Sequence, residues 1–352
     1  MRWDALRLDD GTEAAAGAPA PLLPRGAVTR TFDTPGFRGI TFHEVSSRTA
    51  LNRVPDASRV PFRWTINPYR GCSHACVYCF ARKTHEYLDL DSGHDFDSQI
   101  VVKTNVAEVL RRELAKPSWT HEHVAMGTNV DCYQRAEGRY RLMPGIITAL
   151  TEAKNPFSIL TKGALILRDL DLLTAAAEVT DVSAAVSVGS VDEQVWRTVE
   201  PGTPSPRRRL EVCAALNAAG IRTGVLMAPV LPCLTDSDEQ LEATVAAIAA
   251  SGAAYVSPIA LHLRPGAREW WQAWMRRERP DLLPRYAELY GTRSYAPKAY
   301  QQDLADRVGV LARRYGVGRN RTLRGHRSKR RELPAIRPVA DGTPESDQLS
   351  LL

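Results

Sequence analysis

The chain of 352 residues carries 44% hydrophobic and 24% charged side chains, which is typical of a globular protein with one main catalytic domain and extensions. Its net charge of +6 would be consistent with nucleic-acid binding. However, seven Lys and Arg residues lie between Arg319 and Arg331, so the rest of the chain is close to neutral. No basic start followed by an apolar run marks a secretory signal, and we expect a cytoplasmic protein.

The longest uncharged stretch, residues 244–263, has the length of a membrane span. It is rich in alanine and is interrupted by Ser251, Gly252 and Pro258. We therefore expect a helix, a turn and a buried strand here, and no membrane partner.

The N-terminal segment 1–36 is rich in Ala, Pro and Gly with few apolar anchors, so we expect it to be disordered. Residues 37–61 carry no strong pattern and form an N-terminal extension, either a cap or a preliminary strand. From 62 to 263, short apolar runs alternate with amphipathic segments, as in repeated βα units. We predict strands at 64–67, 123–127, 157–161, 182–188, 223–229 and 254–259.

The segments between these strands have helical patterns, at 106–115, 144–153, 169–177, 206–219 and 237–250. Ser205 before Pro206 suits a helix start, and Gly220 after Ala219 suits a helix end. Six such units predict an α/β fold with a parallel barrel that is either complete or partial. Residues 264–317 are predicted to form a helical C-terminal extension, and 318–352 a basic, disordered tail.

Three of the six cysteines, Cys72, Cys76 and Cys79, lie within eight residues as CxxxCxxC. In a chain of this size without an export signal, that spacing favours metal over disulfides. Thiolates this close can reach one soft metal centre from a single loop, and Gly71 gives the backbone freedom at its entry. An iron-sulfur cube normally takes four cysteines, so three leave one iron open for chemistry.

A zinc site is the structural alternative. It would recruit a fourth ligand such as His43, His74 or His85 to close a tetrahedron. The usual zinc pattern combines CxxC or CxxxxC with a second, distant ligand pair, and the sequence shows no such pair. The spacing therefore favours an iron-sulfur cluster.

CxxxCxxC with Tyr78 just before the last cysteine resembles the signature of the radical S-adenosylmethionine (SAM) superfamily. The wider chain, over roughly 62–235, resembles the branch that includes spore photoproduct lyase. This resemblance rests on segments that occur in order: NPYRGC with CVYCFAR, GTNVDCYQRAEG, ILTKG followed by RDLDLL, SVGS, EPGTPSPRRRL, then AAG and GVLMAPV.

The resemblance implies a partial (β/α)6 barrel with the active site at the C-terminal ends of the strands. It also implies a [4Fe-4S] cluster on Cys72, Cys76 and Cys79, whose open iron binds SAM. Reduction by a flavodoxin- or ferredoxin-like electron donor would then yield a 5′-deoxyadenosyl radical, which removes a hydrogen atom from the substrate.

Further contacts with SAM are expected at Tyr78, Gly127, Thr128, Asn129, Lys162 and Ser187. Lys162 matches a lysine that contacts SAM in the photoproduct lyase branch, although position alone would suit an ordinary loop lysine. Ser187 ends the fourth strand and can bond the SAM ribose, as can Ser190, or belong to a turn. Gly127 to Asn129 end the second strand, where the superfamily lets the backbone meet the SAM amino group; a tight turn needs a glycine equally.

A polar cluster in the same loop is expected to face the substrate or the cluster: Asp131, Tyr133, Gln134 and Glu137. Cys132 is a candidate radical relay, with a small, partly buried thiol as the alternative. Cys213 is expected in the core, and Cys233 fits either location.

Two other segments admit two interpretations each. Residues 200–209 either shape the substrate mouth, with arginines that meet phosphate, or form a rigid loop and a solvated helical turn. Trp270, Trp271 and Trp274 either stack on bases or, as helical spacing favours, lie in the core.

The leading hypothesis is a radical SAM enzyme with nucleic acid as a plausible substrate, because of the resemblance and the basic tail. A second hypothesis assigns a peptide or a small metabolite to the same chemistry. A third is a non-enzymatic, metal-stabilised nucleic-acid-binding protein. The sequence leaves the oligomeric state open.

Overall fold

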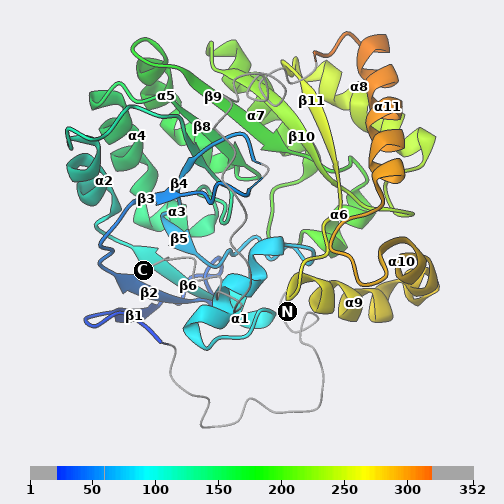
Figure 1. Ribbon diagram of the computed structural model, residues 1–352, viewed down its shortest axis with the longest axis horizontal. Coiled ribbons are helices and arrows are strands. Elements are labelled where there is room, and N and C mark those ends of the chain that lie inside the picture. The colour runs from blue at the N-terminus through cyan, green and yellow to red at the C-terminus, as the bar shows by residue number, and fades with distance from the viewer. Residues whose placement is uncertain (1–21, 59, 319–352) are drawn as a thin grey trace, which may run out of the picture.

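The computed structural model describes residues 22–58 and 60–318, which form two β-sheets, the helices around them and a C-terminal helical layer (Figure 1). The disorder predicted for residues 1–21 and 319–352 lies outside the described residues. Disorder was also predicted for the rest of the segment 1–36, and there the prediction is wrong, because Val28–Thr31 forms strand β1.

The larger sheet has the strand order β11-β10-β9-β8-β7-β4-β3. All neighbouring pairs are parallel except the edge pair of β3 and β4. The bounds are β3 (Leu51–Arg53), β4 (Trp64–Ile66), β7 (Val124–Met126), β8 (Phe157–Thr161), β9 (Val182–Ser187), β10 (Arg222–Val230) and β11 (Val256–Ala260). The six predicted strands and the partial α/β barrel are confirmed, and the barrel is open because β4 and β11 are not neighbours.

Helices connect the parallel strands and cover the sheet, as the predicted βα units require (Figure 1). They are α2 (Val106–Leu114), α3 (Arg135–Tyr140), α4 (Leu142–Glu152), η3 (Ala164–Asp169), α5 (Leu170–Ala177), α6 (Glu193–Val199), α7 (Pro206–Ala218) and α8 (Asp238–Ala250). The Ser205 side chain caps α7, and Gly220 follows its end with a φ of +83°.

A second, smaller sheet was not predicted. Its order is β1-β2-β6-β5, with β2 at Thr41–Val45, β5 at Tyr69–Arg70 and β6 at Gln99–Lys103. The connection from β5 to β6 contains the three clustered cysteines, helix η2 (Phe80–Leu88) and helix α1 (His94–Ser98). The smaller sheet therefore holds both ends of the segment that carries the metal motif.

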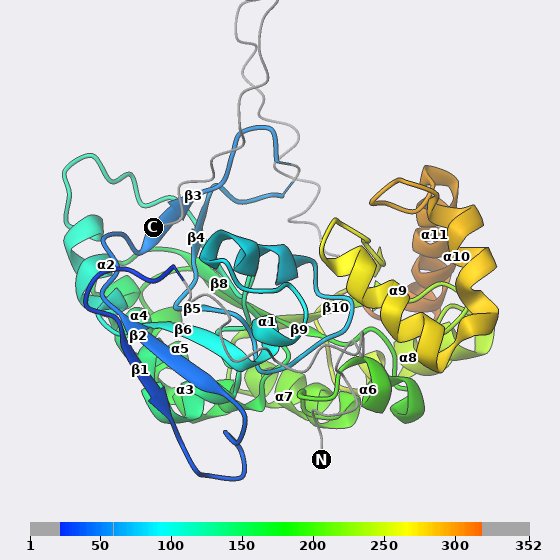
Figure 2. The same ribbon diagram turned by 90° about the horizontal axis from the view of Figure 1, so that it is seen from below.

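The C-terminal extension is helical, as predicted: α9 (Ala267–Glu278), η4 (Pro280–Leu282), α10 (Leu283–Tyr290) and α11 (Lys298–Arg314). Figure 2 shows these helices and the small sheet on opposite sides, with η2 and α1 between them. Trp270, Trp271 and Trp274 are buried in the main core, so the core interpretation of the indole rings is confirmed.

No helix among the described residues is both long enough and apolar enough to cross a bilayer. The uncharged stretch 244–263 divides into the end of α8, a turn and strand β11, which confirms the predicted helix, turn and strand.

Candidate active site

The three clustered cysteines lie on a tight loop, residues 71–79, which we call the cysteine loop. It directly follows β5 and begins with Gly71, whose φ is +83°. A side chain there would meet His85 Cε1 at 2.9 Å and the Gln99 carbonyl oxygen at 3.0 Å, so only glycine fits. Cys72 and Cys76 are buried, and Cys79 is half-buried.

Gln134 holds the cysteine loop on both sides of Cys72. Its Oε1 accepts the Ser73 N–H at 2.8 Å, and its Nε2 donates to the Gly71 carbonyl at 2.9 Å. The Gln134 side chain is fully buried, so both bonds are shielded from water. Gln134 therefore fixes the backbone on which the first cysteine stands.

A buried arginine holds the middle of the loop. Arg82 donates to the Cys76 carbonyl oxygen from Nε at 3.2 Å and from Nη2 at 2.9 Å. Its Nη2 also bonds both carboxylate oxygens of Asp97, at 3.0 and 2.9 Å. Burial raises the pKa of the Asp97 carboxyl group, and Arg82 offsets part of this rise, so that the pKa is about 7. Arg82 is therefore the group that favours the ionised form of Asp97.

The last residue of α6 and the residues that follow it contact the same loop. Gly202 donates its N–H to the His74 carbonyl at 3.0 Å, and Val77 donates to the Val199 carbonyl at 3.0 Å. A Cβ at position 202 would lie 2.2 Å from the Ser73 carbonyl oxygen, so the two backbones touch. The cysteine loop is thus formed by contacts within the protein.

The donor set fits a soft metal centre. Burial raises the pKa of each of the three thiols, so their ionised form needs positive charge nearby. Among the described residues, no three or more His, Cys, Asp and Glu side chains converge as the ligands of a single ion would. In an iron-sulfur cluster each thiolate binds a different iron, so the thiols need not converge on one point.

The histidines considered for a zinc site have other partners. His74 Nδ1 lies 3.3 Å from Asp131 Oδ2, and His85 Nε2 lies 2.8 Å from the Gln99 carbonyl oxygen. His43 bonds Thr29 and Gln99 through its two ring nitrogens. The contacts of His74 and His85 use one ring nitrogen each, and His85 Nδ1 is buried without a hydrogen-bond partner. The closed zinc tetrahedron is disfavoured because no three such ligands converge on one ion among the residues that the structure describes.

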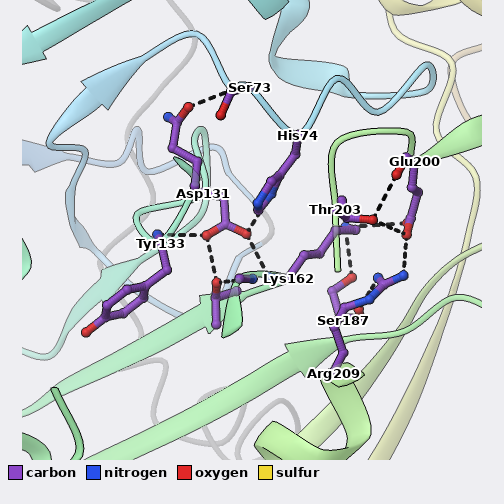
Figure 3. A network of polar contacts seen from close by, with 12 residues as sticks. Ser73, His74, Asp131, Tyr133, Lys162, Ser187, Glu200, Thr203 and Arg209 are labelled. Atoms are coloured by element: carbon purple, nitrogen blue, oxygen red, sulfur yellow. Dashed lines mark hydrogen bonds and ion pairs between the residues drawn. The ribbon is translucent and has the colours of Figure 1, made fainter. Parts of the chain in front are cut away.

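Asp131, in the loop after β7, joins the cysteine loop to the end of β8 (Figure 3). Besides His74, it accepts hydrogen bonds from Thr161 Oγ1 at 2.7 Å and from the Lys162 N–H at 2.6 Å. Burial alone would raise its pKa, but His74 and these donors outweigh burial and lower the pKa to about 2.

A second polar group lies across Lys162 from Asp131 (Figure 3). Lys162 Nζ donates to Ser187 Oγ at 3.0 Å and lies 4.0 Å from Glu200 Oε1. Tyr78 donates its hydroxyl to Glu200, and Arg209 Nη2 donates to Glu200 at 2.5 Å. Burial would raise the pKa of Glu200, but Arg209 and Lys162 outweigh it, so Glu200 is a carboxylate. Three predicted SAM contacts, Tyr78, Lys162 and Ser187, therefore belong to one network.

The three residues that follow β7, Gly127 to Asn129, have different surroundings. A Cβ on Gly127 would lie 1.7 Å from the Leu160 carbonyl oxygen, so packing against β8 and a φ of +82° account for this glycine. Thr128 Oγ1 is buried without a partner, as expected of a group that awaits a ligand. The Asn129 side chain is exposed.

A shallow cleft of about 270 Å³, open to solvent, lies beside this network. Tyr78, Ser190, Glu200 and Pro229 are among its lining residues. Ser190 and Pro229 lie near the C-terminal ends of β9 and β10, which is where ligands bind in parallel barrels.

Other residues of the predicted polar cluster serve the core. The Tyr133 hydroxyl donates to Asp169 at 3.1 Å, and Glu137 accepts from Tyr69 at 2.5 Å and from Arg168 at 2.7 Å. Both side chains are buried, which contradicts the expectation that they face the substrate or the cluster.

The three cysteines outside the cysteine loop differ in their burial. Cys132 is fully buried in the main core, and so is Cys213, as expected for the latter. Cys233 is exposed. In the sequence, Arg82 lies within CVYCFAR and was given no role, and Asp97, which lies in a segment with no recognisable pattern, was not named. Glu200 and Arg209 were named only as parts of a substrate mouth.

The sequence model of the radical SAM superfamily matches residues 66–245, which contain the cysteine loop, Asp131, Lys162 and Glu200. The chain therefore belongs to the radical SAM superfamily. Members of this family use a [4Fe-4S] cluster and SAM for radical chemistry, so the chain is an enzyme of that class.

Among known proteins, uncharacterised proteins of Mycobacterium tuberculosis and Mycobacterium bovis are 52% identical over 322 residues, which are 90% of this chain and 93% of each relative. Among solved structures, spore photoproduct lyase with dinucleoside spore photoproduct has a TM-score of 0.62 and 16% identity, over 86% of this chain and 85% of that one. A variant of that lyase with bound SAM and dinucleoside spore photoproduct has a TM-score of 0.60 and 15% identity, over 78% and 79%. At this identity the likeness shows the fold.

Proposed function

We propose that Cys72, Cys76 and Cys79 hold a [4Fe-4S] cluster with one iron open, and that SAM binds between this iron and the network around Lys162. The carrying observation is the single loop that carries all three thiols, held by Gln134, Arg82 and Gly202, within the segment that the superfamily's sequence model matches. When bound, the cluster supplies the electron that cleaves SAM into methionine and a 5′-deoxyadenosyl radical.

The protein's own contribution is to place SAM. Lys162 Nζ is available to pair with the SAM carboxylate, and Ser187 Oγ, 3.0 Å away, with a ribose hydroxyl. Thr128 Oγ1 lacks a partner and can take a polar group of the amino acid part, with the backbone of Gly127 and Asn129 beside it. The Tyr78 ring, 5.8 Å from Lys162 Nζ, would form one wall.

Glu200 keeps Lys162 in place. Because Arg209 donates to the same carboxylate, Glu200 stays ionised and attracts the ammonium group. The lysine is thereby held at the strand ends before SAM arrives, which lowers the entropy lost on binding.

For the substrate we propose nucleic acid, in a photoproduct-lyase-like repair or modification. The fold likeness to spore photoproduct lyase and the basic run 319–331 support this choice. A peptide or small metabolite is the second candidate. The one-electron donor would be a flavodoxin- or ferredoxin-like protein. The superfamily membership disfavours the non-enzymatic alternative.

The cluster is tested by anaerobic reconstitution of the full chain. We expect about four iron and four sulfide per chain, and slow formation of 5′-deoxyadenosine from SAM after reduction. Cys76→Ala should lose 5′-deoxyadenosine formation, and Cys233→Ala, at an exposed thiol away from the loop, should keep it. Normal formation in Cys76→Ala would refute the assignment, and one zinc per chain would favour a binding protein.

The substrate class is tested by binding. The full chain should bind nucleic acid, as measured by the shift in electrophoretic mobility, and the affinity should fall as the salt concentration rises. Replacement of the seven Lys and Arg residues in 319–331 by Gln should weaken this binding. A binding affinity that changes neither with salt concentration nor with these substitutions would favour a peptide or small metabolite as the substrate.

Cys132 is the proposed hydrogen-atom relay. A relay acts after SAM cleavage, so Cys132→Ala should keep 5′-deoxyadenosine formation and change the product. If product and rate are both unchanged, Cys132 is a core thiol, as its full burial suggests.

A further inference from the structure

A second cleft lies on the other side of the cysteine loop, next to the small sheet. It encloses about 340 Å³, including its open mouth, and its lining residues are Asn67, Tyr69, Arg70, Thr84, Lys103 and Asn129. Neither Lys162 nor Glu200 belongs to it. We call it the Arg70–Lys103 cleft.

Two cations meet in this cleft because of the strand register. β5 and β6 are antiparallel, with Arg70 opposite Val101 and Tyr69 opposite Val102. Since side chains alternate between faces, Lys103 lies on the same face as Val101, as a diagonal neighbour of Arg70. The two charges repel each other, since Arg70 is one of the groups that lower the pKa of Lys103.

The described residues do not neutralise Lys103. Lys103 forms no ion pair within the described part of the chain, and the acidic group that favours its charge is Glu113. One oxygen of Glu113 already accepts the N–H groups of Ala50 and Leu51 at 2.9 and 2.8 Å. Burial and then Arg70 lower the pKa of Lys103 to about 8, as expected of a cation that lacks a counter-ion.

A buried amide completes the cleft. Asn67 is 93% buried (7% exposed), and its Oδ1 has no hydrogen-bond partner. A half-turn of the amide presents the NH2 group at the same place, so Asn67 can donate or accept. An unpartnered buried amide beside two cations is a polar lining for an anion with both oxygens and hydroxyls.

We propose that the Arg70–Lys103 cleft binds a phosphate group of the molecule on which the enzyme acts. A guanidinium bonds two phosphate oxygens in parallel, and an ammonium adds a point charge. Arg70 directly precedes Gly71 and Cys72, so the bound phosphate lies beside the cysteine loop. Asn129, one of the proposed SAM contacts, also lines the cleft, so the phosphate would lie next to the amino acid part of SAM. As a substrate site, the cleft rests on the proposed function; as a phosphate site, it is testable alone.

The test is calorimetric titration of the anaerobically reconstituted full chain with inorganic phosphate at low salt. We expect one phosphate per chain in a background whose basic residues in 319–331 are replaced by Gln. Lys103→Met should weaken binding about tenfold or more, since one charge-assisted hydrogen bond is lost. Lys103→Arg should retain it, and Lys116→Met, at an exposed lysine after α2, should match the parent. No uptake by the parent, or equal uptake by Lys103→Met, overturns the proposal.

A second measurement does not depend on whether a variant folds. Phosphate should protect Lys103, and not Lys116, from acylation by an amine-reactive ester, as followed by mass spectrometry. Equal modification of Lys103 with and without phosphate overturns the proposal.

The source of the phosphate is assigned by competition. Displacement by a nucleoside 5′-monophosphate alone identifies a monoester, and displacement by a dinucleoside monophosphate identifies a phosphodiester. 5′-Deoxyadenosine formation is measured on the same preparation. Protein that cleaves SAM without binding phosphate overturns only this inference, and protein that binds phosphate without cleaving SAM overturns only the proposed function.

Discussion

Lys162 Nζ and Ser187 Oγ lie 3.0 Å apart, so the end of β8 and the end of β9 present one shared polar unit. Ser187 Oγ in turn donates to the Ala228 carbonyl at 2.8 Å, which ties the unit to β10. A ligand that bonds Lys162 therefore meets a side chain already oriented by three strands.

Lys162→Met should weaken SAM binding roughly tenfold or more, because a charge-assisted hydrogen bond contributes about 1.5–3 kcal/mol. Iron content should stay at the parent level, since Lys162 is not a proposed cluster ligand. Equilibrium binding of SAM to the reconstituted protein measures the effect, and Lys154→Met, at an exposed lysine, is the control. Unchanged SAM affinity would remove Lys162 from the site.

Gln134→Ala should loosen the cysteine loop. It leaves the Gly71 carbonyl and the Ser73 N–H without partners in a buried site, at about 1–3 kcal/mol each. We expect iron to be lost to a chelator several times faster than from the parent, followed by absorbance. Gln302→Ala, at an exposed glutamine of α11, should leave the rate alone. Equal rates for both variants would show that Gln134 does not hold the loop.

Arg82→Met should destabilise the protein by about 3–5 kcal/mol, because it leaves the Asp97 carboxylate buried without its partner. Arg111→Met removes an ion pair with Glu152 whose side chains are 46% and 57% exposed, and should cost no more than about 1 kcal/mol. Denaturant unfolding of the metal-free protein compares the two. Similar losses would contradict the assigned role of Arg82.

Asp131 should stabilise the fold in a pH-dependent manner. Its pKa in the fold is about 2, against about 3.9 in an unfolded chain, so its contribution is present above pH 4 and is lost as pH falls through 2. The difference corresponds to about 2–3 kcal/mol. The stability gap between the parent and Asp131→Asn should therefore narrow as pH falls from 5 to 2. A gap that is constant over this range would contradict the lowered pKa.

The parallel strands were predictable because burial on both faces demands apolar runs. In β9, Val182, Ala184 and Val186 are buried on one face and Ala185 is buried on the other. The small sheet was not predictable in the same way. All residues of β1 are exposed, and β5 is only two residues long, so pairing with neighbours defines these strands and no pattern in their own residues does.

The site was predictable where chemistry requires a residue type. Cysteines in CxxxCxxC indicate a cluster whatever surrounds them, and strand ends indicated where Lys162 and Ser187 would lie. The clamps by Gln134 and Arg82 were not predictable, because their partners are backbone carbonyl and N–H groups that any sequence supplies. Gly127 was expected to contact SAM, but close packing of its backbone against the Leu160 carbonyl is sufficient to explain why this position is a glycine.

The backbone contacts of Gly202 with Ser73 and His74 bring together segments more than a hundred residues apart in the chain. The shape of the cysteine loop therefore depends on a neighbour that is distant in the chain. A side chain added at position 202 would displace the backbone between Cys72 and Cys76, so a residue without any ligand atom controls how the thiols are spaced.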